Sequence, residues 1–142
     1  MIVFLVALLP LVSFRVNQMQ APQSTLQISD RSVVFFGPTQ AERDSIIRAE
    51  GLDVAQVFDD FDYYAGKSAS YLKGRGISVE FTTSQVVLVK IGDRTVRIYE
   101  RKKMADVVGL ILTDGVQEPQ LLFGVATDAE LVPQFNDFFR WK

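Results

Sequence analysis

The sequence predicts a single domain of the α/β (α+β) class, in which one mixed, mainly antiparallel sheet carries three helices. The chain has 142 residues, which is about the size of one domain. Hydrophobic residues make up 48% of it and charged residues 23%, as in an ordinary globular protein. Apolar residues recur at threes and fours in some segments, which is typical of helices, and at twos or in unbroken runs elsewhere, which is typical of strands.

The chain begins with an uncharged apolar segment, IVFLVALLPLVSF, at residues 2–14. A helix of this length, at about 1.5 Å per residue, is shorter than the roughly 30 Å core of a bilayer. The length matches the apolar part of a secretory signal, although no Lys or Arg precedes it and no A-x-A site closes it. We expect residues 1–21 to be a signal peptide or an N-terminal membrane anchor of a periplasmic, secreted or membrane-anchored protein. The alternative is a buried N-terminal strand or helix.

The segment that follows is rich in Gln and Ser and has no hydrophobic periodicity. We expect residues 22–31 to form a linker and residues 32–142 to form the folded domain.

The first strand is predicted at residues 32–36, SVVFF, because an unbroken β-branched and aromatic run is typical of a buried strand. The dipeptide Gly37-Pro38 ends this strand. A helix over residues 40–50 follows at once, since Thr39 and Glu42 have the spacing of a capping box.

A second helix is predicted over residues 54–73. Gly51 is expected to end the first helix in the left-handed conformation, and Asp53 is expected to cap the second. The second helix should end at Gly74 or Gly76. Its apolar residues, spaced by threes and fours, are Val54, Val57, Phe58, Phe61, Tyr64, Ala65 and Leu72.

From Ile77 the apolar spacing changes to two, which predicts strands. In residues 77–81 the apolar side chains Ile77, Val79 and Phe81 alternate with polar ones. A hairpin over residues 85–99 is indicated by Gly92-Asp93, which suits a two-residue turn. Two further strands are predicted, at residues 107–112 and 120–125, on either side of a turn at 113–115.

The last helix is predicted over residues 128–139. Thr127 and Glu130 repeat the capping-box spacing of the first helix. Pro133 lies inside the helix, so a distorted first turn is expected. The apolar face of this helix consists of Leu131, Phe135, Phe138 and Phe139.

Residues 107–139, VVGLILTDGVQEPQLLFGVATDAELVPQFNDFF, resemble the end of the thioredoxin fold. In that fold a strand, a turn with Asp-Gly, a strand closed by a glycine (here Gly124) and a Thr-started helix occur in this order. Residues 32–36 and the helix after them resemble its active-site strand and helix. The family's cysteine pair would fall near Gly37–Gln40, where this chain has no Cys.

Two more features depart from the thioredoxin pattern. Ala105-Asp106 stand where the family has its cis-proline, and residues 85–99 read as a hairpin where the family has a helix. The resemblance therefore implies a scaffold without redox activity, and a generic α+β domain accounts for the same pattern.

The chain has neither Cys nor His. The absence of Cys excludes disulfides, thiolate nucleophiles and cysteine metal sites. The absence of His excludes Ser-His-Asp and Cys-His mechanisms. Catalysis would have to depend on carboxylates, Lys, Tyr, Ser or Thr, and we expect no cofactor.

The net charge of −2 argues against a nucleic-acid partner, because phosphate contacts need a concentrated positive field. Asp59, Asp60 and Asp62 are candidates for a divalent-cation site, but their spacing fits no known loop motif and suits a solvated helix face. A basic stretch offers contact with an acidic partner or anionic lipid, or simply a charged sheet edge. It comprises Lys90, Arg94, Arg97, Arg101, Lys102 and Lys103.

Tyrosines offer a further candidate surface. Tyr63, Tyr64 and Tyr71 could line a groove, with Tyr64 expected in the core and Tyr63 pointing elsewhere.

The candidate binding site is the loop after the first strand, at Gly37, Pro38, Thr39 and Gln40. In open α/β sheets ligands bind where strands end and helices begin. The alternative is a plain strand-to-helix turn, because Thr39 and Glu42 already satisfy two of the N–H groups at the helix start.

The function expected from these features is that of a redox-inactive, non-catalytic binding or accessory protein of the bacterial cell envelope. It would have a protein partner and would touch the membrane only through residues 1–14, if these are retained. The alternative is a small hydrolase or transferase that uses carboxylates or a metal. The sequence indicates no oligomeric state.

Overall fold

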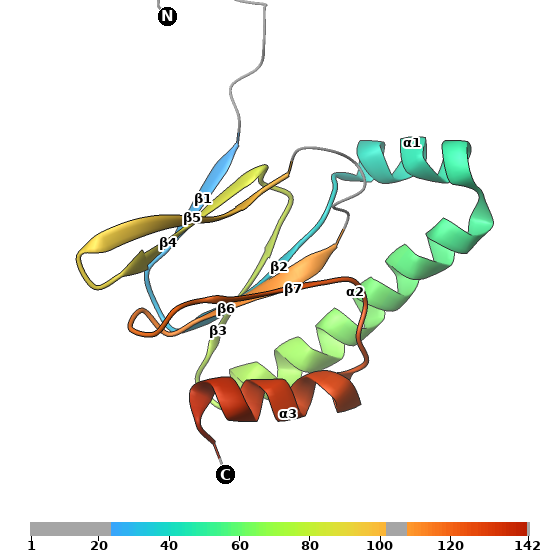
Figure 1. The fold of residues 1–142 in the computed structure, drawn as a ribbon. Coiled ribbons are helices and arrows are strands. Elements are labelled where there is room, and N and C mark those ends of the chain that lie inside the picture. The colour runs from blue at the N-terminus through green and yellow to red at the C-terminus, as the bar shows by residue number, and fades with distance from the viewer. Residues whose placement is uncertain (1–23, 102–107, 142) are drawn as a thin grey trace, which may run out of the picture.

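The computed structural model of the protein describes residues 24–101 and 108–141, which form one α+β domain (Figure 1). The order of elements predicted from Ser32 onward is confirmed, and one more strand precedes them. The elements are β1 (Thr25–Ile28), β2 (Ser32–Phe36), α1 (Gln40–Glu50), α2 (Leu52–Lys73), β3 (Ser78–Thr82), β4 (Val86–Ile91), β5 (Arg94–Glu100), β6 (Gly109–Thr113), β7 (Gln120–Phe123) and α3 (Asp128–Phe139).

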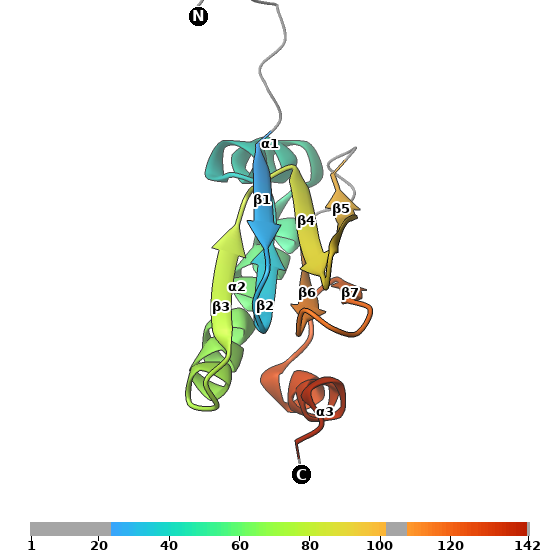
Figure 2. The same cartoon turned by 90° about the vertical axis from the view of Figure 1, so that its left-hand side faces the viewer.

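The strands form two sheets rather than the single sheet that the sequence predicts. The larger sheet has the order β3-β2-β6-β7, and the smaller has the order β1-β4-β5. Each sheet is mixed: β2 pairs parallel with β3 and antiparallel with β6, while β4 pairs parallel with β1 and antiparallel with β5. Figure 2 shows the smaller sheet in front of the larger one.

Strand β2 lies at the centre of three layers, and this explains its unbroken apolar sequence. Successive side chains of a strand point to opposite faces. Val33 and Phe35 pack in the core beneath the helices, and Val34 and Phe36 pack against the smaller sheet. All five residues of the strand are buried.

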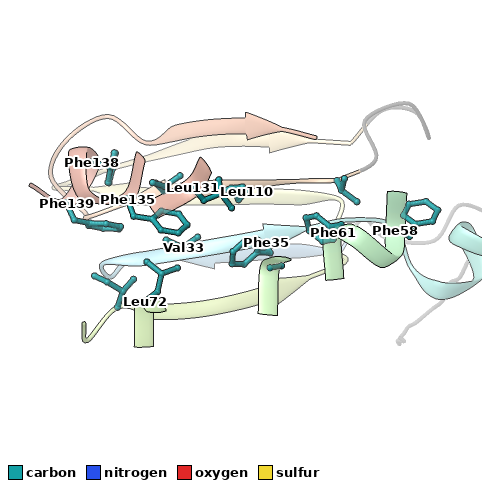
Figure 3. Packing of buried hydrophobic residues seen from close by; sticks show 14 of the residues in the cluster. Val33, Phe35, Phe58, Phe61, Leu72, Leu110, Leu131, Phe135, Phe138 and Phe139 are labelled. Carbon is teal, nitrogen blue, oxygen red and sulfur yellow. The ribbon is translucent and has the colours of Figure 1, made fainter. Parts of the chain in front are cut away.

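The core between the larger sheet and the helices combines phenylalanine rings with aliphatic side chains (Figure 3). Helix α2 contributes Phe58, Phe61 and Leu72, and the apolar face predicted for α3 is buried as expected. Phe81, one of the alternating apolar residues of the strand predicted at residues 77–81, is 56% exposed. It stacks on Phe35 with ring centroids 5.2 Å apart, yet it belongs to the edge strand β3, so one side of its ring stays open.

The linker prediction for residues 22–31 is wrong where β1 forms. Residues Thr25–Ile28 pair with Val86–Val89 of β4, so this part of the chain belongs to the smaller sheet. Only Ile28 of the four is fully buried, which explains why no clear periodicity marks the strand. Residues 1–23, with the apolar segment, lie outside the described residues.

Both predicted capping boxes are present, and the junction between α1 and α2 differs from expectation. Gly51 has the expected positive φ, of 97°, but its ψ of −172° lies outside the left-handed helical region. It also precedes the first residue of α2, and Asp53 makes no cap hydrogen bond because it already lies inside the first turn. The helix ends before Gly74, as predicted, and α3 continues through Pro133.

The turns of the two sheets are joined at one end of the domain. The Gly92 N–H in the β4–β5 turn donates to the Gly115 carbonyl in the β6–β7 turn, at 3.0 Å. Asp114 stabilises the second turn by accepting hydrogen bonds from the backbone N–H groups of Val116 and Gln117. The β4–β5 hairpin is thereby fixed to the larger sheet.

No helix within residues 24–101 and 108–141 has the length and hydrophobicity needed to cross a membrane.

Candidate functional site

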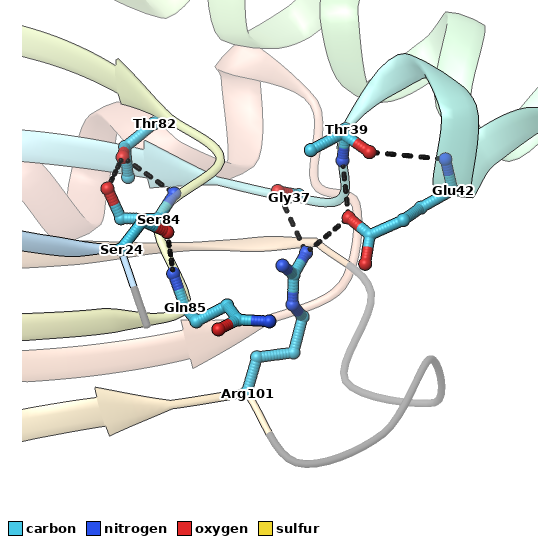
Figure 4. A network of polar contacts seen from close by, with 8 residues as sticks. All are labelled: Ser24, Gly37, Thr39, Glu42, Thr82, Ser84, Gln85 and Arg101. Atoms are coloured by element: carbon cyan, nitrogen blue, oxygen red, sulfur yellow. Dashed lines mark hydrogen bonds and ion pairs between the residues drawn. The ribbon is translucent and has the colours of Figure 1, made fainter. Parts of the chain in front are cut away.

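The loop after β2 is buried, and its backbone is hydrogen-bonded within the protein. Gly37 and Pro38 are buried. The Gly37 N–H donates to the Thr82 carbonyl at 3.1 Å, which extends the pairing of β2 with β3. The Gly37 carbonyl accepts from Arg101 Nη1 at 3.4 Å (Figure 4). Both backbone polar groups of Gly37 therefore have partners within the protein.

The start of α1 is closed by its capping box. Thr39 Oγ1 accepts from the Glu42 N–H at 3.2 Å, and Glu42 Oε1 accepts from the Thr39 N–H at 2.8 Å. Arg101 Nη1 lies 3.1 Å from the same Glu42 oxygen, and the Arg101 side chain is only 7% exposed. Figure 4 shows this arginine bridging the end of β5 and the loop after β2.

Glu42 stays ionised in this setting. Partial burial opposes its charge, but hydrogen bonds from Thr39 and the nearby Arg101 guanidinium outweigh burial and lower the pKa of Glu42. A negative carboxylate thus occupies the positive end of the α1 dipole. The charge of this carboxylate disfavours an anionic ligand at the helix start.

The opposite side of Figure 4 shows how the β3–β4 turn is held near the beginning of β1. Ser24 Oγ accepts from the Gln85 N–H at 3.1 Å, and Thr82 Oγ1 accepts from the Ser84 N–H at 3.0 Å. The end of β3, which faces the loop after β2, is therefore well fixed.

A pocket of about 200 Å³ lies beside the loop, where β2 and β3 end. Its apolar walls include the rings of Phe35, Phe61 and Phe81, and the backbone turn of Gly37 and Pro38 closes one side. Because Phe81 is more than half exposed, an apolar ring at the pocket is accessible from solvent.

One ion pair lines the same pocket. Arg43 of α1 donates to both carboxylate oxygens of Asp62 of α2, at 2.8 and 2.9 Å. The Arg43 guanidinium also lies 4.9 Å from the centre of the Phe58 ring. The hydrogen bond to Asp62 raises the pKa of Arg43, which keeps the guanidinium charged beside this carboxylate.

The structure separates the four residues of the predicted site. Gly37 and Pro38 line the pocket. Thr39 caps α1, and Gln40 is exposed and donates to Asp44 Oδ1 at 3.0 Å along the helix. Sequence reasoning missed Arg43 and Asp62, which stand 19 positions apart and meet only because α1 and α2 pack together.

The carboxylates proposed for metal binding do not converge. Asp60 accepts from Gln56 and Asp62 pairs with Arg43, while Asp59 is exposed. No group of three acidic residues able to hold a metal ion occurs among the described residues. The enzyme alternative therefore gains no support from these aspartates.

The basic stretch is mostly paired within the protein. Arg94 contacts Glu118 at 3.0 Å, Arg97 contacts Glu100 at 3.3 Å, and Arg101 contacts Glu42. Lys90 is exposed. Lys102 and Lys103 lie outside the described residues, as do Ala105-Asp106 and Val107.

The three tyrosines do not form a groove. Tyr63 is 60% exposed and packs edge-on against Tyr64, which is half-buried. Tyr71 lies at the far end of α2 and donates to Asn136 of α3 at 2.8 Å.

The pocket beside Gly37-Pro38 is thus suited to contact rather than to acid–base chemistry, because its only described charges form a closed ion pair. No family model matches the chain, and neither the curated proteins nor the solved structures contain a match to it.

Proposed function

We propose that the protein is a non-catalytic, redox-inactive binding or accessory protein of the bacterial cell envelope. A partner protein contacts it at the pocket beside Gly37-Pro38. The observation that carries this proposal is the pocket itself. Its walls are aromatic, its two charged side chains form an ion pair, and the ring of Phe81 is exposed beside it.

The size of the pocket favours a protein side chain over a small-molecule ligand. Pockets for cofactors and drug-sized ligands have volumes of about 300–1,000 Å³. The volume of about 200 Å³ found here falls below that range. It suits one apolar side chain presented by a partner, with Phe81 as an aromatic anchor of the kind enriched at protein interfaces.

A thioredoxin-like scaffold is part of this proposal. The two segments that carry the resemblance lie in one sheet, since β2 pairs with β6, and β6 pairs with β7 before α3 begins. The β4–β5 hairpin, in place of a helix, and the absence of Cys remain departures from that family. Such a scaffold would serve for binding without thiol chemistry.

Two phenylalanines allow a matched test. Phe81 and Phe123 are 56% and 60% exposed and lie on the two edge strands of the same sheet, but only Phe81 lines this pocket. The purified protein, immobilised, should retain a partner from an envelope extract. Phe81→Ala should lose that partner, and Phe123→Ala should retain it. Equal retention by both variants, or no retained partner at all, would refute the proposal.

The proposed periplasmic, secreted or membrane-anchored location rests on the apolar segment at residues 2–14. A fusion of residues 1–23 to a reporter that is active only outside the cytoplasm should give a signal. Retention of the fusion in the cytoplasm would show that the segment is not an export signal.

A further inference from the structure

Two arginines and three aromatic rings form a continuous stack where α2 and α3 end. The Arg75 guanidinium lies 5.0 Å from the centre of the Tyr71 ring and 4.9 Å from that of Trp141. Trp141 stacks on Phe139, with centroids 5.0 Å apart, and Arg31 lies 5.7 Å from the Phe139 centroid. We call these five residues the arginine–aromatic stack.

The fold holds the rings of this stack in place. Arg140 adopts a left-handed conformation, with φ 61° and ψ 40°, and so turns the chain back after α3. The Trp141 N–H then donates to the Asn136 carbonyl at 2.8 Å. The Asn136 side chain accepts from the Tyr71 hydroxyl at 2.8 Å. Asn136 therefore holds both the Tyr71 hydroxyl and the backbone of Trp141, the two residues whose rings contact Arg75.

The two arginines of the stack differ from most other arginines of the domain because they form no ion pair with a carboxylate of the described residues. Four arginines of the domain pair with carboxylates, namely Arg43, Arg94, Arg97 and Arg101. Arg31 and Arg75 are exposed and have no carboxylate partner within residues 24–101 and 108–141. The planar, fork-like arrangement of guanidinium N–H donors can bind a carboxylate in a bidentate manner.

We propose that the arginine–aromatic stack binds the carboxylates of an acidic segment of a partner polypeptide. Charge complementarity supports this partner, because the two exposed guanidinium groups of the cluster pair with no carboxylate of the described ranges 24–101 and 108–141. Holding the arginines on rings also lowers the entropy that they lose on binding.

A membrane surface fits these residues less well. Insertion into the lipid interface needs exposed apolar side chains. Here Phe139 is only 8% exposed, and Tyr71 and Trp141 are half-buried. A nucleic acid fits poorly as well, since the chain has a net charge of −2.

The proposed surface is distinct from the pocket beside Gly37-Pro38. That pocket lies next to α1, and Figure 1 shows α1 and the end of α3 at opposite ends of the domain. A failure of one proposal therefore leaves the other standing.

Trp141 makes the test direct, because it is the single Trp of the chain and its fluorescence reports on the stack. The purified protein is titrated at low ionic strength with an acetylated hexaglutamate peptide, and with hexaglutamine as the control peptide. We expect a saturable change in Trp141 fluorescence with hexaglutamate alone, weakened by added salt.

Variants then assign the binding to the stack. Arg75→Gln and Arg31→Gln should each weaken binding about tenfold or more, the effect of losing one charge-assisted contact. Arg75→Lys keeps the charge but loses the planar fork, and should bind with intermediate affinity. The matched control is Arg48→Gln, which removes an exposed arginine of α1 that also lacks a carboxylate partner among the described residues and should leave binding unchanged.

Several results would overturn the proposal. These are no saturable binding by the wild type, undiminished binding by Arg75→Gln, or an equal loss in Arg48→Gln, which would indicate a general charge effect. Binding to anionic phosphatidylglycerol vesicles without binding to hexaglutamate would assign the surface to a membrane instead. Circular dichroism melting of each variant separates a loss of binding from a loss of folding.

Discussion

Gly109, in β6 of the larger sheet, lies too close to its neighbours to carry a side chain. A methyl group on this residue would overlap the Leu122 carbonyl oxygen of β7 and the ring of Phe36. Backbone on one side and a buried ring on the other leave little room for adjustment. The position therefore requires glycine for reasons of space.

Gly109→Ala should accordingly destabilise the domain by about 1–3 kcal/mol, the usual cost of overpacking a core. Chemical denaturation measures the loss. Gly66 of α2 is the matched control, because a methyl group there meets nothing within 4 Å. Gly66→Ala should stabilise the protein by about 0.5–1 kcal/mol through helix propensity. Equal effects of the two changes would contradict the described packing.

The candidate site was predictable at the residue level only in part. Gly37 and Pro38 stand out in the sequence because they interrupt an apolar run, and both line the pocket. Arg43 and Asp62 carry no such signal. Their meeting depends on the turn at Gly51, which folds α1 back against α2.

At the scale of elements, the two capping boxes contribute similarly to stability. Thr39 and Thr127 each accept a hydrogen bond from the third residue of their helix, at 3.2 Å in both cases. Thr39→Ala and Thr127→Ala should each cost about 1 kcal/mol, because a backbone N–H loses its partner. Urea unfolding of the two variants tests this, and unchanged midpoints would show that these caps do not stabilise the helices.

The elements that the sequence predicts well are those whose local signals agree with their surroundings. Strand β2 is covered on both faces, so its apolar run is unbroken, and the hairpin of β4 and β5 has a strong turn signal at Gly92-Asp93. Strand β1 has neither signal. Its conformation depends on pairing with β4, about 60 residues further along the chain, and no local pattern reveals such a contact.

At the scale of the whole molecule, two hydrogen-bonded carboxylates, Glu42 and Asp114, contribute to the response of stability to acid. Partial burial opposes the charge of Asp114, but hydrogen bonds from the Gln117 and Val116 N–H groups outweigh it and lower its pKa. Glu42 behaves in the same way through Thr39 and Arg101. One carboxylate holds the β6–β7 turn, and the other connects α1 to the end of β5.

Because both pKa values are lower in the folded state, their stabilising effect is present above the unfolded values of about 4. It is lost as the pH falls below those values, since protonation then favours the unfolded chain. Both carboxylates should therefore contribute to a decrease of stability in acid. The double variant Glu42→Gln, Asp114→Asn should be less stable at neutral pH and should lose less on acidification. Parallel pH profiles for the variant and the wild type would contradict this.

The division into two sheets is a property of the whole molecule that the sequence does not reveal. The strand order predicted along the chain is correct from β2 onward, but it does not specify which strands pair. The β4–β5 hairpin pairs with β1 rather than with the larger sheet. The hydrogen bond from Gly92 to Gly115 then holds the hairpin against the larger sheet. Such contacts between residues far apart in the sequence determine how the two sheets are layered.

The parallel pairing of β1 with β4 also has a mechanical consequence. A pull on the chain before Thr25 acts along β1, so the hydrogen bonds between Thr25–Ile28 and Val86–Val89 bear the load together, in shear. This strand is held by its pairing with β4, because it pairs with no strand of the larger sheet. Under tension the domain should therefore yield first at this strand, and force spectroscopy would record a small extension before the main unfolding event.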